Sequence, residues 1–350
     1  MTRTTFAAYR TEYPNLPAEL LFFFDMKTAA RVEGRLQAHT VMEFLEHYAK
    51  RHGGTRVQPG PVIEICSRLC SHGWMSLVDV GGFMGLENRY LTIIRDGNDP
   101  LSDTLAGRMF DCAVYGLPAV YDHYAGSVWP LINWNANGDP QIGTCFVIEK
   151  WIAVTALHCI LPASRLAIRT VPAEAFQRSL FYSHPNEGLD LALMRFDAPV
   201  FSASPAIPLP SSDPEVLLEV MALGYPNVPG FMPALAAEAA QVSGRLTVAR
   251  GRVASKPAEI FSRTEMLLIT ARVRGGFSGG PVLDAYGQVA GMISREPMAE
   301  AIAGVGVKYD ELGYGAAVPA SAITELLDGI DSGEIKPLDM SGVNFETFEE

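Results

Sequence analysis

The sequence lacks any long uninterrupted apolar run. A helix that crosses a membrane needs about 20 consecutive apolar residues, and the early cluster at residues 20–24 is far shorter. The first five residues, Met-Thr-Arg-Thr-Thr, also lack the charged-then-apolar order of a secretion signal. These absences argue against a membrane protein and predict a cytoplasmic one.

Cysteine is scarce, and its number is odd. The five are Cys66, Cys70, Cys112, Cys145 and Cys159. They form no disulfide framework, which fits a reducing compartment. A bridge between Cys145 and Cys159 stays open as the less favoured alternative. Cys66, Cys70 and His72 have a spacing that could hold a metal, but on a helix the two cysteines more simply share one buried face. We therefore expect neither a metal nor a cofactor.

Basic residues are not in excess either. The chain carries a formal net charge of −12, with 12 basic and 14 acidic residues in positions 1–125 and 15 and 25 in the remainder. Binding to duplex DNA needs a dense basic face that replaces phosphate counterions. The sequence therefore does not predict a nucleic-acid partner.

Residues 274–281, Arg-Gly-Gly-Phe-Ser-Gly-Gly-Pro, have the composition of a nucleophile loop. A serine hydroxyl needs a neighbouring base to become a nucleophile. It also needs backbone N–H groups to receive the negative charge that develops on the substrate. Glycines on both sides of Ser278 permit the tight backbone path that this requires. Alone, such a run is more often a turn, so two other segments decide the matter.

The first of these segments, residues 143–159, is apolar and β-branched and ends in Thr-Ala-Leu-His-Cys. It predicts a buried strand that carries His158 at its end. Histidine is the expected general base, because its pKa of about 6.5 lets it take and return a proton near neutrality. In the second segment, Asp190 opens a short apolar strand. A carboxylate there can orient an imidazole and stabilise its protonated form.

The three segments, in the order His, Asp, Ser, resemble those of the trypsin-like (chymotrypsin-fold) serine peptidases. The family pattern Thr-Ala-Ala-His-Cys matches residues 155–159 with Leu157 in place of one alanine, Asp-(Leu/Ile)-Ala-Leu matches 190–193, and Gly-x-Ser-Gly-Gly-Pro matches 276–281. The resemblance implies His158 as base, Asp190 as its orienting acid and Ser278 as nucleophile. It also implies an oxyanion hole formed by the backbone N–H groups of Gly276 and Ser278.

The remainder of this region has short apolar segments separated by Gly, Pro and Asn, which is typical of all-β folds. With the resemblance, we expect a mainly β fold of two antiparallel β-barrels, chymotrypsin-like, over residues 126–208 and 213–320. A proline-rich bridge at 205–214 would join them, with the triad at their interface. A closing helix is predicted at 321–330, and the acidic tail at 331–350 is expected to be mobile.

The first 125 residues have a different pattern. Apolar residues follow helical spacing at 38–49 and 62–70, strand-like pieces occupy 74–80 and 89–94, and a helical pattern with a break at Pro118 covers 103–124. Two helices, a ribbon and a helix resemble a winged helix-turn-helix. We therefore expect a mostly α-helical, winged-helix-like regulatory or interaction domain over residues 1–125. Its near-neutral charge favours protein contacts or sensing over DNA binding.

The predicted site departs from many relatives at Phe277, where they carry an aspartate that pairs with a freed N-terminus. Control by the N-terminal domain, a partner or a ligand is the hypothesis in its place. By the resemblance, Arg272, Ser294 and Arg295 lie where the substrate side chain binds, and the absence of an acid there disfavours cleavage after Lys or Arg. Basic residues over 245–274 would favour an acidic segment in the substrate, although a solvated strand face is the more favoured interpretation.

The leading hypothesis is an intracellular serine endopeptidase that acts through an acyl-enzyme without a cofactor. Its substrate would be a protein or peptide, cut selectively, and limited proteolysis in a stress or defence response fits. The first alternative is a non-catalytic peptidase-fold scaffold or sensor. The second is a DNA-linked regulator with a peptidase effector.

Overall fold

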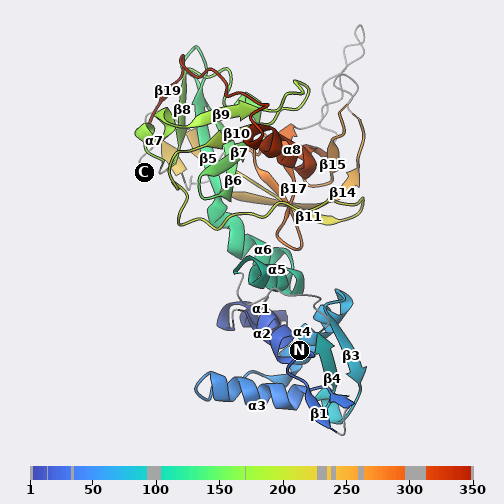
Figure 1. Ribbon diagram of the computed structural model, residues 1–350. Helices are drawn as coiled ribbons and strands as arrows, with labels where there is room; N and C mark the ends of the chain where they lie inside the picture. The colour runs from blue at the N-terminus through green and yellow to red at the C-terminus, as the bar shows by residue number, and fades with distance from the viewer. Residues whose placement is uncertain are drawn as a thin grey trace. The chain divides into compact units, whose positions relative to one another are not determined.

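A computed structural model describes residues 3–13, 15–32, 35–92, 104–169, 171–226, 235–237, 242–258, 264–295 and 313–347. Contacts divide the chain into two compact units, Met1–Val120 and Tyr121–Glu350 (Figure 1). Within the described ranges, no helix has both the length and the apolar character needed to span a membrane. The predicted boundary at residues 125 and 126 stays a prediction.

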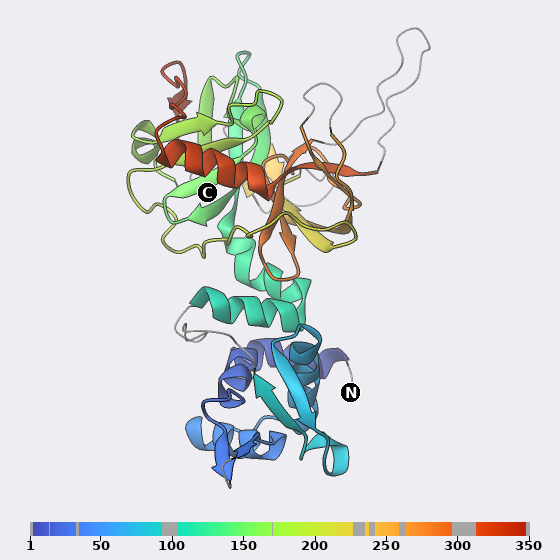
Figure 2. The same ribbon diagram turned by 45° about the vertical axis from the view of Figure 1, so that its right-hand side comes forward.

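In the second unit, six antiparallel strands form a closed barrel in the order β11-β14-β15-β18-β17-β16 (Figure 2). They are β11 (Glu219–Gly224), β14 (Thr247–Ser255), β15 (Leu267–Ile269), β16 (Pro281–Asp284), β17 (Val289–Arg295) and β18 (Gly315–Pro319). Buried apolar side chains such as Val220, Ile269 and Val282 fill its interior. The second of the two predicted barrels is therefore confirmed. A separate hairpin consists of β12 (Leu235–Ala237) and β13 (Val242–Gly244).

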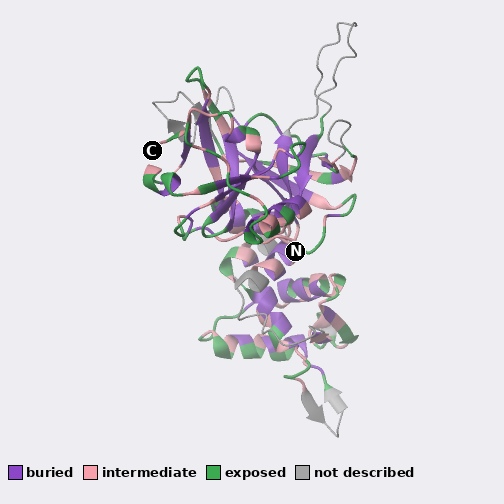
Figure 3. Cartoon of the chain, turned by 45° about the horizontal axis from the view of Figure 1, so that its top comes forward, coloured by how far each residue is buried: buried purple, intermediate pink, exposed green. Residues whose placement is uncertain are grey.

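The other sheet of this unit has seven strands and stays open. Its order is β19-β8-β5-β6-β7-β10-β9, and Figure 3 shows buried residues along the strands of this unit. The strands are β5 (Val128–Trp134), β6 (Pro140–Glu149), β7 (Ile152–Thr155), β8 (Arg165–Ile168), β9 (Leu180–Ser183), β10 (Ala192–Arg195) and β19 (Asn344–Phe345). The short helical pieces beside them are η2 (Ala125–Ser127), η3 (Leu157–Cys159) and α7 (Ala173–Gln177).

The prediction of a first closed barrel is wrong. Closure would require the end strands β8 and β9 to pair, but the free edge of β8 is taken by β19, which runs parallel to it. One edge of a strand can hydrogen-bond to only one neighbour. The first half of this unit is therefore a half-barrel in the part of the chain that the structure describes.

The prediction of a mobile C-terminal tail is also wrong. The Leu338 N–H donates to the Phe181 carbonyl at 2.7 Å, and the Glu346 N–H donates to the Leu166 carbonyl at 2.9 Å. The Phe345 ring stacks on Phe176 and Phe181 with centroid distances of 5.4 and 5.6 Å. The tail is thus held to β9 and β8 by backbone hydrogen bonds, and Phe345 adds aromatic contacts to α7 and β9.

The predicted closing helix is confirmed as α8 (Ala320–Asp331). The Asp213 carboxylate accepts hydrogen bonds from the backbone N–H and the hydroxyl of Ser321, at 3.0 and 2.7 Å, in the first turn. At the other end, Asp331 pairs with Arg195 of β10 at 3.0 Å. The helix therefore follows β18 of the closed barrel and ends against the open sheet (Figure 2).

The first unit is mostly helical. Its helices are α1 (Arg3–Glu12), α2 (Leu16–Phe23), α3 (Val41–Arg51), α4 (Pro59–Ser71) and α5 (Thr104–Tyr115), followed by α6 (Leu117–Tyr124), which continues into the second unit. Two antiparallel ribbons pair β1 (Ala30–Val32) with β2 (Arg35–Gln37) and β3 (Met75–Asp79) with β4 (Arg89–Thr92), and η1 (Phe83–Gly85) joins the last two. The predicted helices and the predicted ribbon are confirmed, while the helical break falls at Gly116 (φ 72°), two residues before Pro118.

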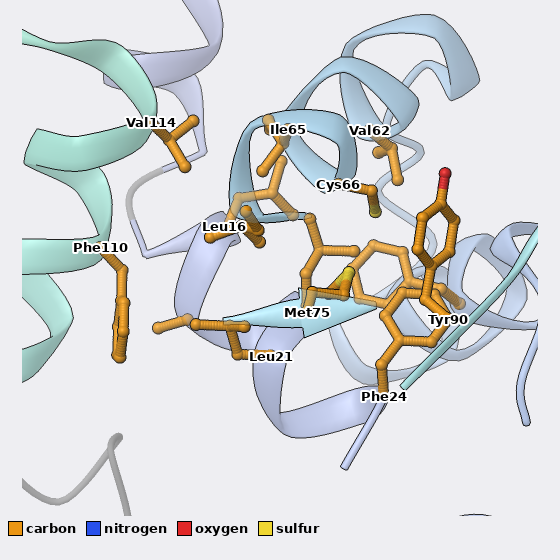
Figure 4. Close-up of a cluster of buried hydrophobic side chains, with 14 of the residues drawn as sticks. Leu16, Leu21, Phe24, Val62, Ile65, Cys66, Met75, Tyr90, Phe110 and Val114 are labelled. Atoms are coloured by element: carbon orange, nitrogen blue, oxygen red, sulfur yellow. The ribbon is translucent and has the colours of Figure 1, made fainter. Parts of the chain in front are cut away.

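An apolar core holds this unit together (Figure 4). Leu16, Ile65 and Cys66 lie in it with no solvent exposure, and burial raises the pKa of the Cys66 thiol. The fully buried Cys66 and the partly buried Cys70 pack with this core, as the helical spacing predicted. Within the described residues, no group of three or more His, Cys, Asp or Glu side chains could hold a metal ion.

Candidate active site

His158 lies in η3, directly after β7. All four residues of β7 are buried, and the strand lies between β6 and β10. The chain leaves the sheet at Ala156, so the His158 side chain emerges from it and is 51% exposed. The predicted arrangement of a buried strand that ends in a histidine is thus present.

Asp190 receives three hydrogen bonds. Its Oδ2 lies 2.6 Å from His158 Nδ1, its Oδ1 accepts from the His158 backbone N–H at 2.9 Å, and Oδ2 also accepts from Ser294 Oγ at 2.9 Å. A carboxylate can only accept, so Nδ1 must carry a proton. This fixes the tautomer and leaves Nε2 of the neutral ring as the basic atom.

The surroundings of His158 favour its charged form. Its hydrogen bond to Asp190 is the largest influence that raises its pKa above the ordinary value, and contact with Cys159 adds to it, while burial opposes both. Cys159 Sγ lies 3.7 Å from His158 Nε2 and 3.6 Å from the Ser278 carbonyl oxygen. The imidazolium that forms during proton transfer would therefore be stabilised.

Ser278 lies in the loop that enters β16. Two glycines of this loop have a backbone that other residues rarely adopt, with φ of 95° at Gly276 and 81° at Gly279. A Cβ at Gly279 would also overlap the Thr144 carbonyl, and one at Gly276 would lie 2.5 Å from the Tyr225 carbonyl. Both positions therefore need glycine, because of the positive φ and because neighbouring carbonyl groups leave no room for a Cβ.

The carbonyl groups and the N–H groups of the loop differ in their hydrogen bonding. Thr144 N–H donates to the Ser278 carbonyl at 2.9 Å, and Thr144 Oγ1 donates to the Gly276 carbonyl at 2.7 Å. Within the residues that the structure describes, the N–H groups of Gly276 and Ser278 donate to no protein acceptor, and no hydrogen bond joins the Ser278 hydroxyl to His158. As far as the described residues show, both N–H groups are therefore available for an oxyanion.

Residues 143–292 match the trypsin-like peptidase domain family. This part of the chain is a trypsin-like peptidase domain. His158, Asp190 and Ser278 all lie inside the matched region. No protein of curated function matches the chain.

Three solved structures to which the chain is similar over part of its length are named as proteases. The HtrA-type protease AlgW with a tripeptide is 18% identical with a TM-score of 0.46, and the match covers 62% of this chain and 64% of that one, less than two thirds of its length. The Rv3671c protease of M. tuberculosis in its active form is 19% identical, with a TM-score of 0.43 and coverage of 60% and 82%. The serine endoprotease from Yersinia pestis is 18% identical, with a TM-score of 0.43 and coverage of 62% and 66%.

Phe277 of the peptidase domain belongs to the core of the closed barrel and is 2% exposed. A Cβ on Gly224 would lie 2.7 Å from the Phe277 Cα, so β11 passes close to the loop at this point. The Phe277 backbone N–H donates to the Arg274 carbonyl at 3.0 Å, and the Phe277 carbonyl accepts from the Gly280 N–H at 2.8 Å. Where many relatives have a charged residue, this domain has an apolar anchor.

The residues predicted to bind the substrate side chain lie in different surroundings. Arg272 is exposed beside the loop. The Ser294 side chain is 2% exposed and donates to Asp190, at the irregular pairing between Ile293 and Arg295. Arg295 pairs with Ala316 through its backbone, and its side chain lies outside the described residues.

Two further polar residues at the site were not predicted in their present roles. Ser294 holds Asp190, and Thr144 holds the nucleophile loop. Neither has a sequence signal of its own, because a serine or threonine within an apolar strand has the same appearance with or without such a partner. None of the five cysteines forms a disulfide, so Cys145 and Cys159 are not bridged.

Proposed function

We propose that the chain is a serine endopeptidase that hydrolyses peptide bonds of a protein partner. The observation that supports this most directly is the His158–Asp190 hydrogen bond of 2.6 Å, in the same site as a loop with two N–H groups that have no acceptor among the described residues. Acyl transfer requires a base, an orienting acid and oxyanion donors to be present together. A binding scaffold would not require any of these three features.

In the proposed mechanism, Ser278 Oγ attacks the substrate carbonyl carbon and passes its proton to His158 Nε2. The Asp190 carboxylate stabilises the imidazolium, and the N–H groups of Gly276 and Ser278 bind the oxyanion. His158 then gives the proton to the leaving amine, which departs and leaves an acyl-enzyme. Water, activated by the same imidazole, releases the acid and restores Ser278.

The Ser278 hydroxyl must reach His158 when substrate binds. Catalytic hydrogen bonds are often long or badly aligned in an unliganded enzyme and tighten in the complex. A fluorophosphonate probe tests the arrangement, because it reacts only with an activated serine. Labelling of the wild-type chain that disappears in Ser278→Ala supports the enzyme. A folded wild-type chain that takes no label supports the alternative of a non-catalytic scaffold or sensor.

The N-terminal unit is proposed to be a winged-helix-like domain that regulates the peptidase or recruits its partner. Support comes from the ribbon of β3 and β4, which follows two helices. The apolar side chains of Leu77 and Val78 in β3, and of Val80 and Met84 in the connection to β4, are exposed. An apolar exposed ribbon suits protein contact better than DNA phosphates. Deleting residues 1–116 should change activity or substrate choice, and unchanged values for both would contradict this role.

The substrate is proposed to carry an acidic segment, and the location is proposed to be cytoplasmic. Arg272 and Arg274 are exposed on either side of Val273, just before the nucleophile loop. The absence of a disulfide among the five cysteines supports a reducing compartment. Profiling of cleaved peptides tests the preference, since Arg272→Glu should lower cleavage beside acidic residues. The same profile for both chains would contradict it.

A further inference from the structure

Thr144 is a fully buried polar residue beneath the nucleophile loop. It lies in β6, among apolar side chains such as Phe146 and Val147. A hydroxyl taken out of water is costly unless it forms hydrogen bonds. Thr144 Oγ1 forms two, since it donates to the Gly276 carbonyl at 2.7 Å and accepts from the Tyr225 N–H at 3.0 Å.

The backbone of Thr144 is engaged as well. Its N–H donates to the Ser278 carbonyl at 2.9 Å, and its carbonyl accepts from Thr155 Oγ1 at 2.7 Å. One residue of the open sheet therefore holds the carbonyl groups of Gly276 and Ser278, which belong to the loop of the closed barrel. These are the two residues whose own N–H groups have no acceptor in the described part of the chain.

The contacts of Thr144 fix two peptide planes of the loop. The plane between Gly276 and Phe277 is held at its carbonyl by Thr144 and at its N–H by the Arg274 carbonyl, at 3.0 Å. The plane between Ser278 and Gly279 is held at its carbonyl by Thr144 and at its N–H by the Ile293 carbonyl, at 2.7 Å. The Ser278 N–H belongs to the plane between these two, so its direction follows from theirs.

We infer that Thr144 is a positioning residue for the oxyanion hole. The inference rests on the proposed peptidase function and adds to it the group that aims the Ser278 N–H donor. Loss of one oxyanion donor typically lowers kcat by about 10² to 10³-fold. Removal of the Thr144 hydroxyl leaves both donors present but one supporting plane less restrained, so we expect a smaller loss of about 10 to 100-fold.

Thr144→Val removes the hydroxyl and keeps the branched shape that suits a buried strand. The Tyr225 N–H also lies 3.2 Å from the Gly276 carbonyl, so these two groups keep each other as partners and the variant should fold. Thr144→Ser keeps the hydroxyl and should restore most of the activity. Thr155→Val is the matched control, because it removes a buried threonine hydroxyl that bonds to Thr144 but not to the loop.

The experiment measures kcat and KM on a peptide substrate, and the affinity for a peptide aldehyde, which forms an oxyanion when it adds to Ser278. Thr144→Val should lower kcat and aldehyde affinity by the same factor. KM should stay nearly constant, as should binding of an uncleaved peptide in the Ser278→Ala background. Thr144→Ser and Thr155→Val should both stay within about threefold of the wild type.

An equal loss of kcat in Thr155→Val, or unchanged aldehyde affinity in Thr144→Val, would overturn the inference and leave the peptidase function standing. A loss that Thr144→Ser does not restore would overturn it too, since shape rather than the hydroxyl would then matter. A wild-type chain that reacts with neither fluorophosphonate nor aldehyde would overturn the proposed function and this inference with it.

Discussion

The two halves of the peptidase domain pair their outer strands in different ways. The second half closes on itself, because β16 pairs with β11 after one circuit of the barrel. The first half stays open, and its edge strand β8 is paired with the C-terminal strand β19. One half is complete within a continuous stretch of chain, while the other depends on a segment far away in the sequence.

Because of this difference, the contacts that hold the open edge and the contacts that hold the candidate active site lie in different parts of the sheet. His158 and Asp190 lie beside β7 and β10, inside the open sheet, whereas the C-terminal segment is bonded to β8 and β9. The side chains of the candidate active site are held by contacts across to the closed barrel, such as Ser294 to Asp190. We therefore expect changes at the interface of the two halves to affect rate, and changes at the open edge to affect stability.

The largest effect is expected at Asp190, where both halves meet. Asp190→Asn should lower kcat on the order of 10⁴-fold, because an amide cannot fix the tautomer or stabilise the imidazolium. Steady-state kinetics on a peptide substrate measure this. Ser294→Ala, which removes one of the three donors to Asp190 from the closed-barrel side, should cost only about tenfold. Equal losses in the two variants would contradict the assignment.

The next largest effect is expected on the stability of the open sheet, at its C-terminal edge strand. Phe345→Ala should lower the free energy of unfolding by about 2 kcal/mol, since it removes a half-buried ring that stacks on Phe176 and Phe181. Urea unfolding measures this, and kcat should not change. Asn344→Ala, at an exposed position of the same strand, is the control and should leave stability within about 0.5 kcal/mol. A stable Phe345→Ala chain would mean that the first half does not need its C-terminal strand.

A smaller effect is expected in the pH dependence. Only neutral His158 can take the Ser278 proton, and its pKa is raised by Asp190 and then by Cys159. Activity should therefore rise with pH through a limb that lies above the ordinary histidine value of about 6.5. Cys159→Ala removes the second influence and should move this limb to lower pH.

The quantity measured for this prediction is kcat/KM against pH, which reports the pKa of the free enzyme. A limb at the same pH in wild type and Cys159→Ala would show that the thiol does not affect the base. A limb in Cys159→Ala at higher pH would reverse the sign of the expected effect.

The smallest effect is expected from an ion pair at the open edge. Arg165 of β8 contacts Glu346 at 2.8 Å, and both side chains are more than a third exposed. Such pairs contribute about 0.2 to 1 kcal/mol and weaken with salt. Glu346→Gln should therefore lower stability by less than 1 kcal/mol, as measured by urea unfolding at low salt. A loss as large as that of Phe345→Ala would show that charge, rather than ring stacking, holds the strand.

The sequence alone determined the local elements and the residues of the candidate site. The buried strand before His158, the glycine loop around Ser278 and the helix at Ala320–Asp331 all follow from short-range patterns of apolar, glycine and proline residues. In the first unit, the same patterns predicted the helices α3 to α6 and the ribbon of β3 and β4, but not α1, α2 or the ribbon of β1 and β2. These features depend on neighbours within a few turns of chain, so one sequence was enough to predict them.

Only the tertiary structure decided how distant segments pair. The C-terminal residues 338–346 mix apolar side chains with two acids and two other polar residues, and nothing in this pattern indicates that they pair with β8 and β9. Ser294 and Thr144 likewise take their roles from groups more than a hundred residues away in the chain. A hydroxyl or an isolated aromatic ring has no periodicity of its own, and its role follows from the partner that folding brings to it.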